Sequence, residues 1–128
     1  VTDNNSLEFG DLTLSDPAQY NLEIQIQLPQ SVGQLIVRVN GTIVYSATGP
    51  FNDFRQIFIG IVPGDEVSAF GECTTLDDPS SFITFAGIKN PGFQFMWFQN
   101  LGEGESATFI FTAADHASDY LIGFARGS

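Results

Sequence analysis

The chain has 128 residues, with 15 acidic and 4 basic side chains and a formal net charge of -11. That length favours one domain with a single core, and a hydrophobic content of 43% excludes intrinsic disorder. The charge excludes the basic surface that binds nucleic acid or anionic membranes, and no apolar run is long enough for a transmembrane helix. We therefore expect a soluble protein in an extracellular location or on a virion surface, where such acidity is common.

The N-terminal stretch combines a polar start with a short apolar pattern. Residues 1–6 are predicted to form a flexible arm, and residues 7–128 to form the single domain. Between Leu7 and Leu14 the apolar positions change phase at Gly10, which is typical of a β-bulge in a bent strand.

The clearest alternation of apolar and polar residues runs from Tyr20 to Leu28 and predicts a β-strand. Its inward residues are Leu22, Ile24, Ile26 and Leu28. Its outward residues are Asn21, Glu23, Gln25 and Gln27, and we expect this polar face to contact water.

The dipeptide Asn40-Gly41 predicts a β-hairpin from Gln34 to Ser46, because a type I′ turn needs positive φ at both central residues. Strict pairing from this turn places Ile36 opposite Tyr45, on the same face as Ile43. These three residues would then form an apolar outer face that requires a cover, which is another layer, a neighbouring chain or a ligand.

The middle and C-terminal parts of the chain add further strands. Residues 54–62 carry apolar side chains on both faces, including Phe54 and Phe58, so this strand is expected to be central or covered. The turn Pro63-Gly64-Asp65 is predicted to join it to residues 66–73 in a second hairpin. Further strands are expected at 81–88, 93–98, 107–113 and 119–125. The pattern predicts an all-β fold, a single antiparallel β-sandwich of the jelly-roll or immunoglobulin-like kind.

The strand at 93–98 is aromatic on both sides. Phe93, Phe95 and Trp97 are predicted to share one face, and Met96 and Phe98 the other.

Exposed aromatic rings would suit a carbohydrate-binding module or lectin. Trp97, Tyr20 and Tyr120 are the candidate ligand-binding residues if their rings lie on an open sheet face. The other aromatic side chains are 13 phenylalanines and one more tyrosine, and phenylalanine lacks the polar edge that suits a wet sugar site. Core and interface packing therefore explains the aromatic content better.

Side chains for catalysis are few. The one histidine, His116, lies in an acidic segment with Asp115 and Asp119, and the one cysteine, Cys73, lies outside any motif that activates a thiol. Cys73 is predicted to be a buried apolar side chain. No phosphate-binding loop, dinucleotide fingerprint or zinc-ligand spacing is present. The chain is therefore predicted not to be an enzyme. A small glycosidase is a weaker alternative, because among 15 acidic residues some pair will lie at a suitable separation by chance.

No cofactor is predicted, with calcium as the one alternative. Loop carboxylates bind this hard cation, and they would meet if their loops share one end of the sandwich. The candidate metal ligands are Asp77, Asp78, Asp115 and Asp119.

Taken together, the residues predict a structural or assembly subunit of an extracellular surface, such as a virion decoration or fibre protein or a filament subunit. Its expected partners are further copies of the same chain in a homo-oligomer or larger assembly. The predicted interface consists of Ile36, Ile43, Tyr45, Phe54 and Phe58. Carbohydrate binding is the alternative function.

Overall fold

The computed structural model describes residues 20–114 and 119–127, which form nine β-strands and no helix. The strands are β1 (Tyr20–Leu28), β2 (Val32–Val39), β3 (Thr42–Thr48), β4 (Phe51–Ile61), β5 (Glu66–Thr75), β6 (Phe82–Lys89), β7 (Gln94–Leu101), β8 (Ser106–Thr112) and β9 (Asp119–Gly127). The predicted arm at 1–6 and bent strand at 7–14 lie outside the described residues. Within those residues there is no helix that could cross a membrane.

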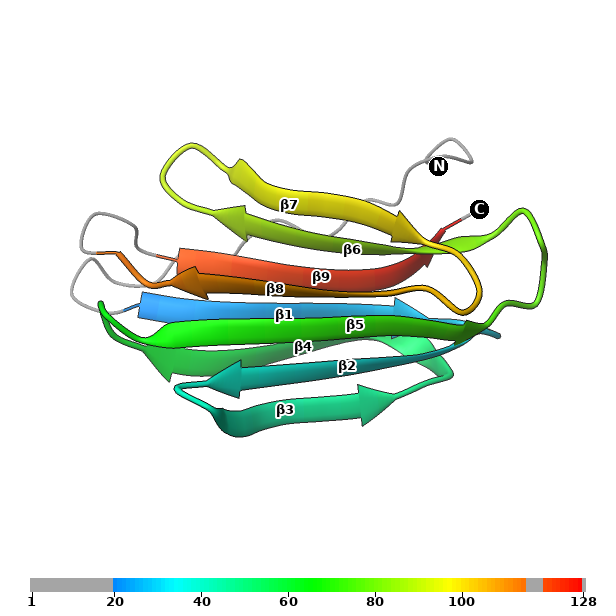
Figure 1. Cartoon of the computed structure of the whole chain (residues 1–128), viewed down its shortest axis with the longest axis horizontal. Helices are drawn as coiled ribbons and strands as arrows, with labels where there is room; N and C mark the ends of the chain where they lie inside the picture. Colours follow the sequence, from blue (N-terminus) through cyan, green and yellow to red (C-terminus); the bar gives the residue numbers. More distant parts are fainter. Residues whose placement is uncertain (1–19, 115–118, 128) are drawn as a thin grey trace.

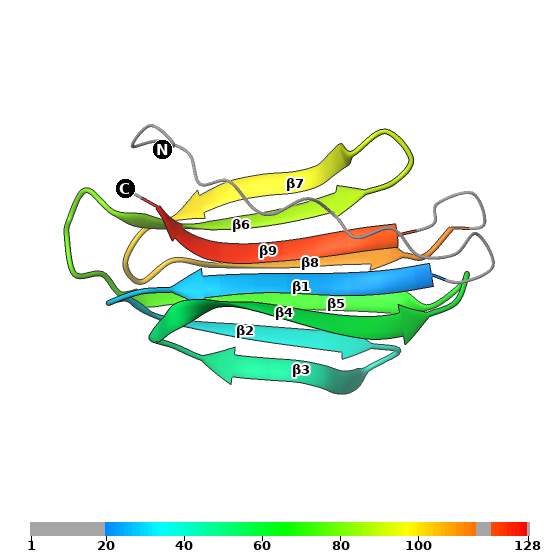
Figure 2. The ribbon, with the colours of Figure 1, turned by 180° about the vertical axis from the view of Figure 1, so that it is seen from behind.

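The nine strands form two sheets that pack face to face (Figure 1, Figure 2). The five-stranded sheet has the order β4-β1-β9-β6-β7, and the four-stranded sheet has the order β3-β2-β5-β8. Paired strands are antiparallel except β1 and β9, which run parallel. The predicted class, an all-β sandwich of mainly antiparallel strands, is confirmed.

The core lies between the sheets, and β1 contributes to it as the alternation predicts. All four of its inward side chains have no exposed area. Burial of each such side chain stabilises the fold by about 1.5–3 kcal/mol. They are Leu22, Ile24, Ile26 and Leu28.

Phe85 of β6 is the centre of an aromatic cluster that joins the two sheets. Its ring makes edge contacts with Trp97, Phe109 and Phe124 at centroid separations of 5.6, 5.5 and 5.7 Å. Trp97 of β7 also stacks on Phe109 of β8, with centroids 4.8 Å apart and an interplanar angle of 10°. Since β7 and β8 belong to different sheets, this stack fixes how the sheets approach each other.

Asn40 and Asp65 link the β2–β3 turn to the corner between β4 and β5. Asn40 and Gly41 have φ of 52° and 84°, which confirms the predicted turn with positive φ at both residues. The Asn40 side chain donates to Asp65 Oδ1 and accepts from the Glu66 amide, both at 2.9 Å. Asp65 Oδ2 accepts from the Val62 amide at 2.9 Å. These bonds tie the β2–β3 turn of the four-stranded sheet to the β4–β5 corner, which connects the two sheets.

The predicted hairpin of residues 54–62 with 66–73 is wrong. β4 pairs with β1 in one sheet, whereas β5 pairs with β2 and β8 in the other. The turn Pro63-Gly64-Asp65 therefore carries the chain between sheets, and its backbone exchanges hydrogen bonds of 2.8 and 2.9 Å with Ala113 beyond β8. The strand expected to be central or covered, β4, is an edge strand, and its Phe54 and Phe58 side chains are exposed.

A β-bulge in the β2–β3 hairpin changes the face on which Tyr45 lies. The register shifts between Val37 and Arg38, so that Val37 pairs with Tyr45. The prediction that Tyr45 shares the outer face with Ile36 and Ile43 is therefore wrong, because the extra residue turns Tyr45 toward the core. Burial there raises the pKa of its phenol.

A second bulge, in β7, reverses another predicted face. Gly87 pairs with Trp97 and Ile88 pairs with Phe95, which leaves Met96 as the extra residue. The predicted face shared by Phe95 and Trp97 is wrong: Trp97 points into the core and is 8% exposed, while Phe95 is 56% exposed on the outer side.

The outer face of β1 is not wet at its centre. Glu23 and Gln25 are fully buried, so the expectation of water contact is wrong for both. A buried carboxylate needs hydrogen-bond donors, and the amides of Gln25 and Gln56 donate to Glu23 Oε2 at 2.8 and 3.0 Å. The middle of the five-stranded sheet is therefore covered on its outer side.

We predict that Gly87→Ala destabilises the fold and that Gly60→Ala does not. A Cβ at Gly87 would lie 2.4 Å from the Trp97 ring, whereas one at Gly60 meets nothing within 4 Å. Overpacking of this kind costs about 1–3 kcal/mol, and the Gly60 variant should stay within about 0.5 kcal/mol of the wild type. Urea unfolding followed by Trp97 fluorescence measures both; equal midpoints for the two variants would contradict the packing of Trp97 on β6.

We also predict that Asp65 makes the fold sensitive to acid. Hydrogen bonds from the Val62 amide and the Asn40 side chain lower the pKa of its carboxyl in the folded protein. Because the folded-state pKa lies below the unfolded one, the carboxylate stabilises the fold above about pH 4 and loses this contribution as the pH falls through the folded-state pKa. Thermal unfolding across this range should show a shallower loss of stability for Asp65→Asn than for the wild type, and parallel curves would refute it.

Candidate functional site

Exposed apolar side chains gather at the edges of both sheets. Nine large apolar side chains are exposed among the described residues, and each lies on or beside one of the four edge strands β3, β4, β7 and β8. Exposed apolar patches on a folded domain often mark sites of interaction. They are Ile43, Val44, Phe54, Phe58, Val62, Phe93, Phe95, Phe98 and Ile110.

The densest group is on β7, and we name Phe93, Phe95 and Phe98 the β7 cluster. Phe95 and Phe98 pack edge to face on the outer side of the strand, with centroids 5.4 Å apart and an interplanar angle of 86°. Phe93 precedes β7 and has a positive φ of 50°, which is unfavourable for a bulky residue. The three rings are 45–56% exposed, so a strained backbone and two packed rings present aromatic surface to solvent.

β7 is also an edge strand without the usual protection. Natural edge strands carry charged residues or proline that oppose pairing with another chain. β7 consists of Gln94-Phe95-Met96-Trp97-Phe98-Gln99-Asn100-Leu101 and has neither. Its bulge is the one protective feature, and it lies near the start of the strand. Among the described strands none pairs with the outer edge of β7, and its later half has no feature that opposes strand addition.

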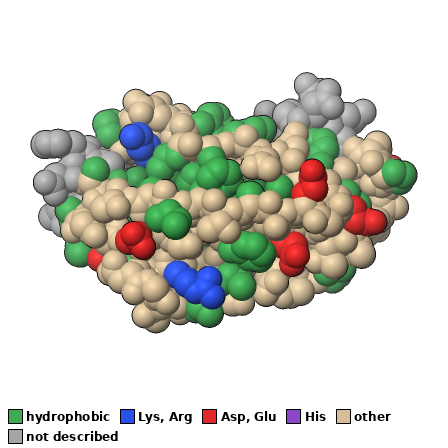
Figure 3. All heavy atoms as spheres, viewed as in Figure 1, with side chains coloured by type: hydrophobic (Ala, Val, Ile, Leu, Met, Phe, Trp, Pro, Cys, Tyr) green, Lys and Arg blue, Asp and Glu red, His purple; other side chains and the backbone are tan. Residues whose placement is uncertain are grey.

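Exposed apolar side chains are more widely separated on the outer face of the four-stranded sheet. Figure 3 shows this face, with separate hydrophobic patches and scattered charged side chains. Ile43 and Ile110 lie on different edge strands and are 52% and 62% exposed, and Ile36 between them is half-buried. This face offers isolated apolar contacts and no aromatic cluster comparable to that on β7.

The predicted interface residues do not form one surface. Ile36 and Ile43 lie on the outer face of the four-stranded sheet, and Tyr45 packs against the core. Phe54 and Phe58 are exposed on β4, in the other sheet. The aromatic richness of residues 93–98 was the available signal for the β7 cluster, but regular alternation assigned its rings to opposite faces.

Trp97 and Tyr120, the predicted sugar-stacking residues, are both buried. Trp97 lies in the aromatic core, and Tyr120 is 2% exposed with its ring against Phe111. The Tyr120 hydroxyl accepts a hydrogen bond from the Ala114 amide at 3.0 Å. The interpretation of these two rings as an open platform is therefore corrected, because the sandwich needs them in its core. The side chain of Tyr20 lies outside what the structure describes.

Asp77 and Asp119 lie at opposite ends of β9. Asp77 forms an ion pair of 2.9 Å with Arg126 near the end of that strand, while Asp119 begins it. Seven residues of extended chain separate the two positions by about 23 Å. The expectation that their loops meet at one calcium site is therefore wrong for this pair.

Of the other two candidate metal ligands, the structure describes Asp78 alone. Asp78 accepts hydrogen bonds from the Ser80 amide and hydroxyl at 2.9 and 2.8 Å, which orders its own loop and lowers the pKa of its carboxyl. Asp115 lies outside the described residues. In residues 20–114 and 119–127, no group of three histidine, cysteine or acidic side chains is placed to hold a metal ion.

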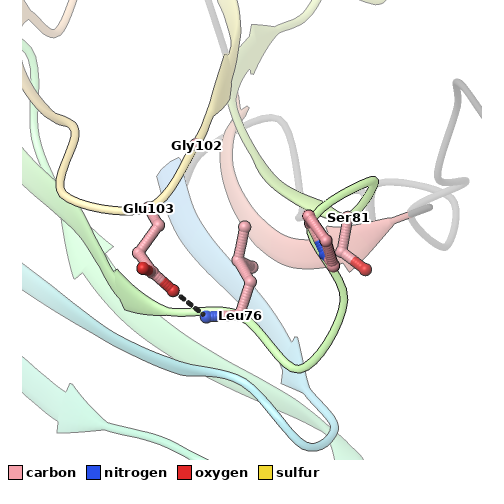
Figure 4. Close-up of a pocket in the computed structure, with 5 residues that line it drawn as sticks. Leu76, Ser81, Gly102 and Glu103 are labelled. Atoms are coloured by element: carbon pink, nitrogen blue, oxygen red, sulfur yellow. Dashed lines mark hydrogen bonds between the residues drawn. The ribbon is translucent and has the colours of Figure 1, made fainter.

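A pocket of about 360 Å³ lies between the β5–β6 and β7–β8 connections (Figure 4). Glu103 accepts a hydrogen bond from the Leu76 amide at 3.0 Å, and the Ser81 hydroxyl accepts one from Arg126 at 2.7 Å. Glu103 therefore joins the two connections, and Ser81 joins the β5–β6 connection to β9. The pocket lining contains one carboxylate rather than an acid–base pair. The lining residues are Leu76, Pro79, Ser81, Gly102 and Glu103.

Cys73 is buried, as the sequence predicts. Burial, with Glu103, Glu105 and Glu72 nearby, raises the pKa of its thiol to about 11. A nucleophilic cysteine requires the opposite shift. His116, the other predicted candidate for catalysis, lies outside the described residues.

Comparison with protein-family models, curated proteins and solved structures gives no match to this chain.

We predict that Cys73 is unreactive in the native protein. With a thiol pKa of about 11, about one thiol in a thousand is ionised at pH 8, and burial also excludes the reagent. A colorimetric thiol reagent should modify the protein slowly in buffer and at once in denaturant. Rapid modification without denaturant would contradict the buried position of Cys73.

Proposed function

We propose that the protein is a non-enzymatic assembly subunit that associates with further copies of itself through the edge of β7. The observation that carries this proposal is the β7 cluster, three half-exposed phenylalanines on or directly before an edge strand that has no charged residue. Subunits of this kind build extracellular surfaces such as virion decorations, fibres and filaments, and the acidic composition suits such a location.

The absence of charge on β7 matters because the whole molecule is strongly acidic. Two copies with a net charge of -11 each repel one another. Contact is least unfavourable where neither copy presents acidic side chains, and β7 provides such a strip. Pairing β7 with β7 of a second copy is self-complementary, since a two-fold contact uses the same surface on both partners.

The apolar contribution to such a contact is moderate. Complete burial of a phenylalanine contributes about 1.5–3 kcal/mol, so covering three half-exposed rings on each partner contributes about 6 kcal/mol. Association costs about 4–15 kcal/mol in lost freedom. Backbone hydrogen bonds between the strands must therefore add to the apolar term, at about 0.5–1.5 kcal/mol each. A contact of this strength suits an assembly in which several weak contacts act together.

The alternative, a carbohydrate-binding module, has less support. Its strongest candidate rings, Trp97 and Tyr120, are in the core. The exposed rings are phenylalanines, which have no polar edge to bond a sugar hydroxyl.

We predict that Phe95→Ser with Phe98→Ser abolishes self-association. Light scattering after size exclusion, over a concentration series, should give a multiple of the chain mass for the wild type and the chain mass for the double variant. Added salt should strengthen wild-type association, because it screens repulsion between acidic copies.

Ile110→Ser is the matched control, since Ile110 is 62% exposed on an edge strand of the other sheet. It should associate like the wild type. A wild type that stays monomeric at high concentration would disprove the proposal, and so would equal dissociation of the Ile110→Ser control.

A further inference from the structure

The outer face of the five-stranded sheet is buried at its centre. Ile88 of β6 and Leu121 of β9 are directly paired and form an apolar cluster separate from the main core. They are 1% and 0% exposed. Their chain neighbours Gly87 and Ile122 face the other sheet, so this pair lies on the side away from it.

Cross-strand neighbours show how far the covered region extends. One row crosses the sheet in the order Phe58, Glu23, Leu121, Ile88, Phe95. The three central members have at most 1% exposed area, while Phe58 and Phe95 at the two ends are 50% and 56% exposed. Neighbours in the same sheet lie beside a side chain and leave its end open. Complete burial therefore requires a cover above β1, β9 and β6.

In the next row the smallest residues lie at the centre, and we name this part of the outer face the trough. It runs from Gln56 through Gln25, Gly123 and Ala86 to Phe98. Gly123 and Ala86 at its centre are buried although they are the smallest side chains of the row. A low floor between higher borders leaves room for the side chains of an apolar segment.

No described strand supplies the cover. All nine described strands belong to the two sheets. In Figure 2 the five-stranded sheet faces the reader, and no other strand lies in front of β9 and β1. The four-stranded sheet packs on the opposite side.

We propose that the trough formed by β1, β9 and β6 is the docking site of residues 1–19 of the same chain. This segment leads directly into Tyr20, the first residue of β1, which is one border of the covered region. Nineteen residues extend to about 60 Å, twice the roughly 30 Å of the nine-residue β9. The segment contains the apolar side chains that such a floor needs, Leu7, Phe9, Leu12 and Leu14. The face is buried in a single copy of the chain, so no second molecule is required.

Docking of residues 1–19 would also limit which surface is free for assembly. With the centre of the five-stranded sheet occupied, its outer face offers another molecule only the two edge strands, where the phenylalanines of β4 and β7 lie.

Thiol protection in the chain of residues 1–128 tests the proposal. Ala86→Cys places a thiol on the trough floor, and Thr108→Cys places one at an exposed position on β8. Cys73 is the internal control, because it is buried in the core and is expected to react only on unfolding. We expect a maleimide to modify the Ala86→Cys thiol at least about tenfold more slowly than the Thr108→Cys thiol, at every protein concentration. Adding Leu12→Asp and Leu14→Asp should remove this protection while Cys73 stays unreactive.

Three results would overturn the proposal. Equal rates for the two thiols would mean that the floor is open, and protection lost on dilution would mean that another copy covers it. Protection that survives both aspartates would mean that a different segment is the occupant.

A second measurement keeps the proposal testable if the aspartates unfold the domain, which modification of Cys73 would reveal. A nitroxide on Thr13→Cys alters none of the apolar side chains and should broaden the amide signals of Ala86 and Gly123. An equal mixture of spin-labelled and isotope-labelled molecules should show no broadening. Docking within the chain would be rejected by broadening in the mixture. It would also be rejected if molecules that carry both the nitroxide and the isotope label showed no broadening.

Discussion

The contact between Trp97 and Gly87 sets the position of β7 in the sandwich. The indole ring covers the space where a side chain at Gly87 would lie, and its other face stacks on Phe109 of the opposite sheet. Trp97 Nε1 is buried with no hydrogen-bond partner among the described residues, which costs about 1–3 kcal/mol. Packing of the large ring must outweigh this cost, so the inward position of Trp97 depends on close contact rather than on polar bonding.

Glycine has the same role on the opposite sheet. A Cβ at Gly71 of β5 would lie 2.9 Å from the rings of Phe85 and Phe124. Two strands that face each other thus carry glycine where aromatic rings fill the space between the sheets. The aromatic rings therefore occupy the space that side chains at these glycines would fill. This explains why a chain rich in phenylalanine needs glycine within its strands.

The sequence was sufficient for the fold class, for most strand positions and for the inward face of β1. Regular alternation and a turn with positive φ are local properties, and they were visible in residues such as Leu22 and Gly41. Sheet partners were not visible: the corner at Asp65 is a compact turn whether it joins two strands of one sheet or two sheets. The two bulges were also missed, because an extra residue in β3 or β7 changes no local composition signal.

The same limitation explains the errors at the candidate site. Tyr45 and Trp97 each follow a bulge, so each lies on the face opposite to the one that strict alternation assigns. The burial of Glu23 depends on what covers the sheet, which the strand's own pattern does not contain. The extra residue in β7 has two consequences at once: it turns Trp97 into the core and brings Phe95 and Phe98 together on the outer side. One irregularity thus supplies both the ring that joins the sheets and the exposed aromatic surface on which the proposed self-association rests.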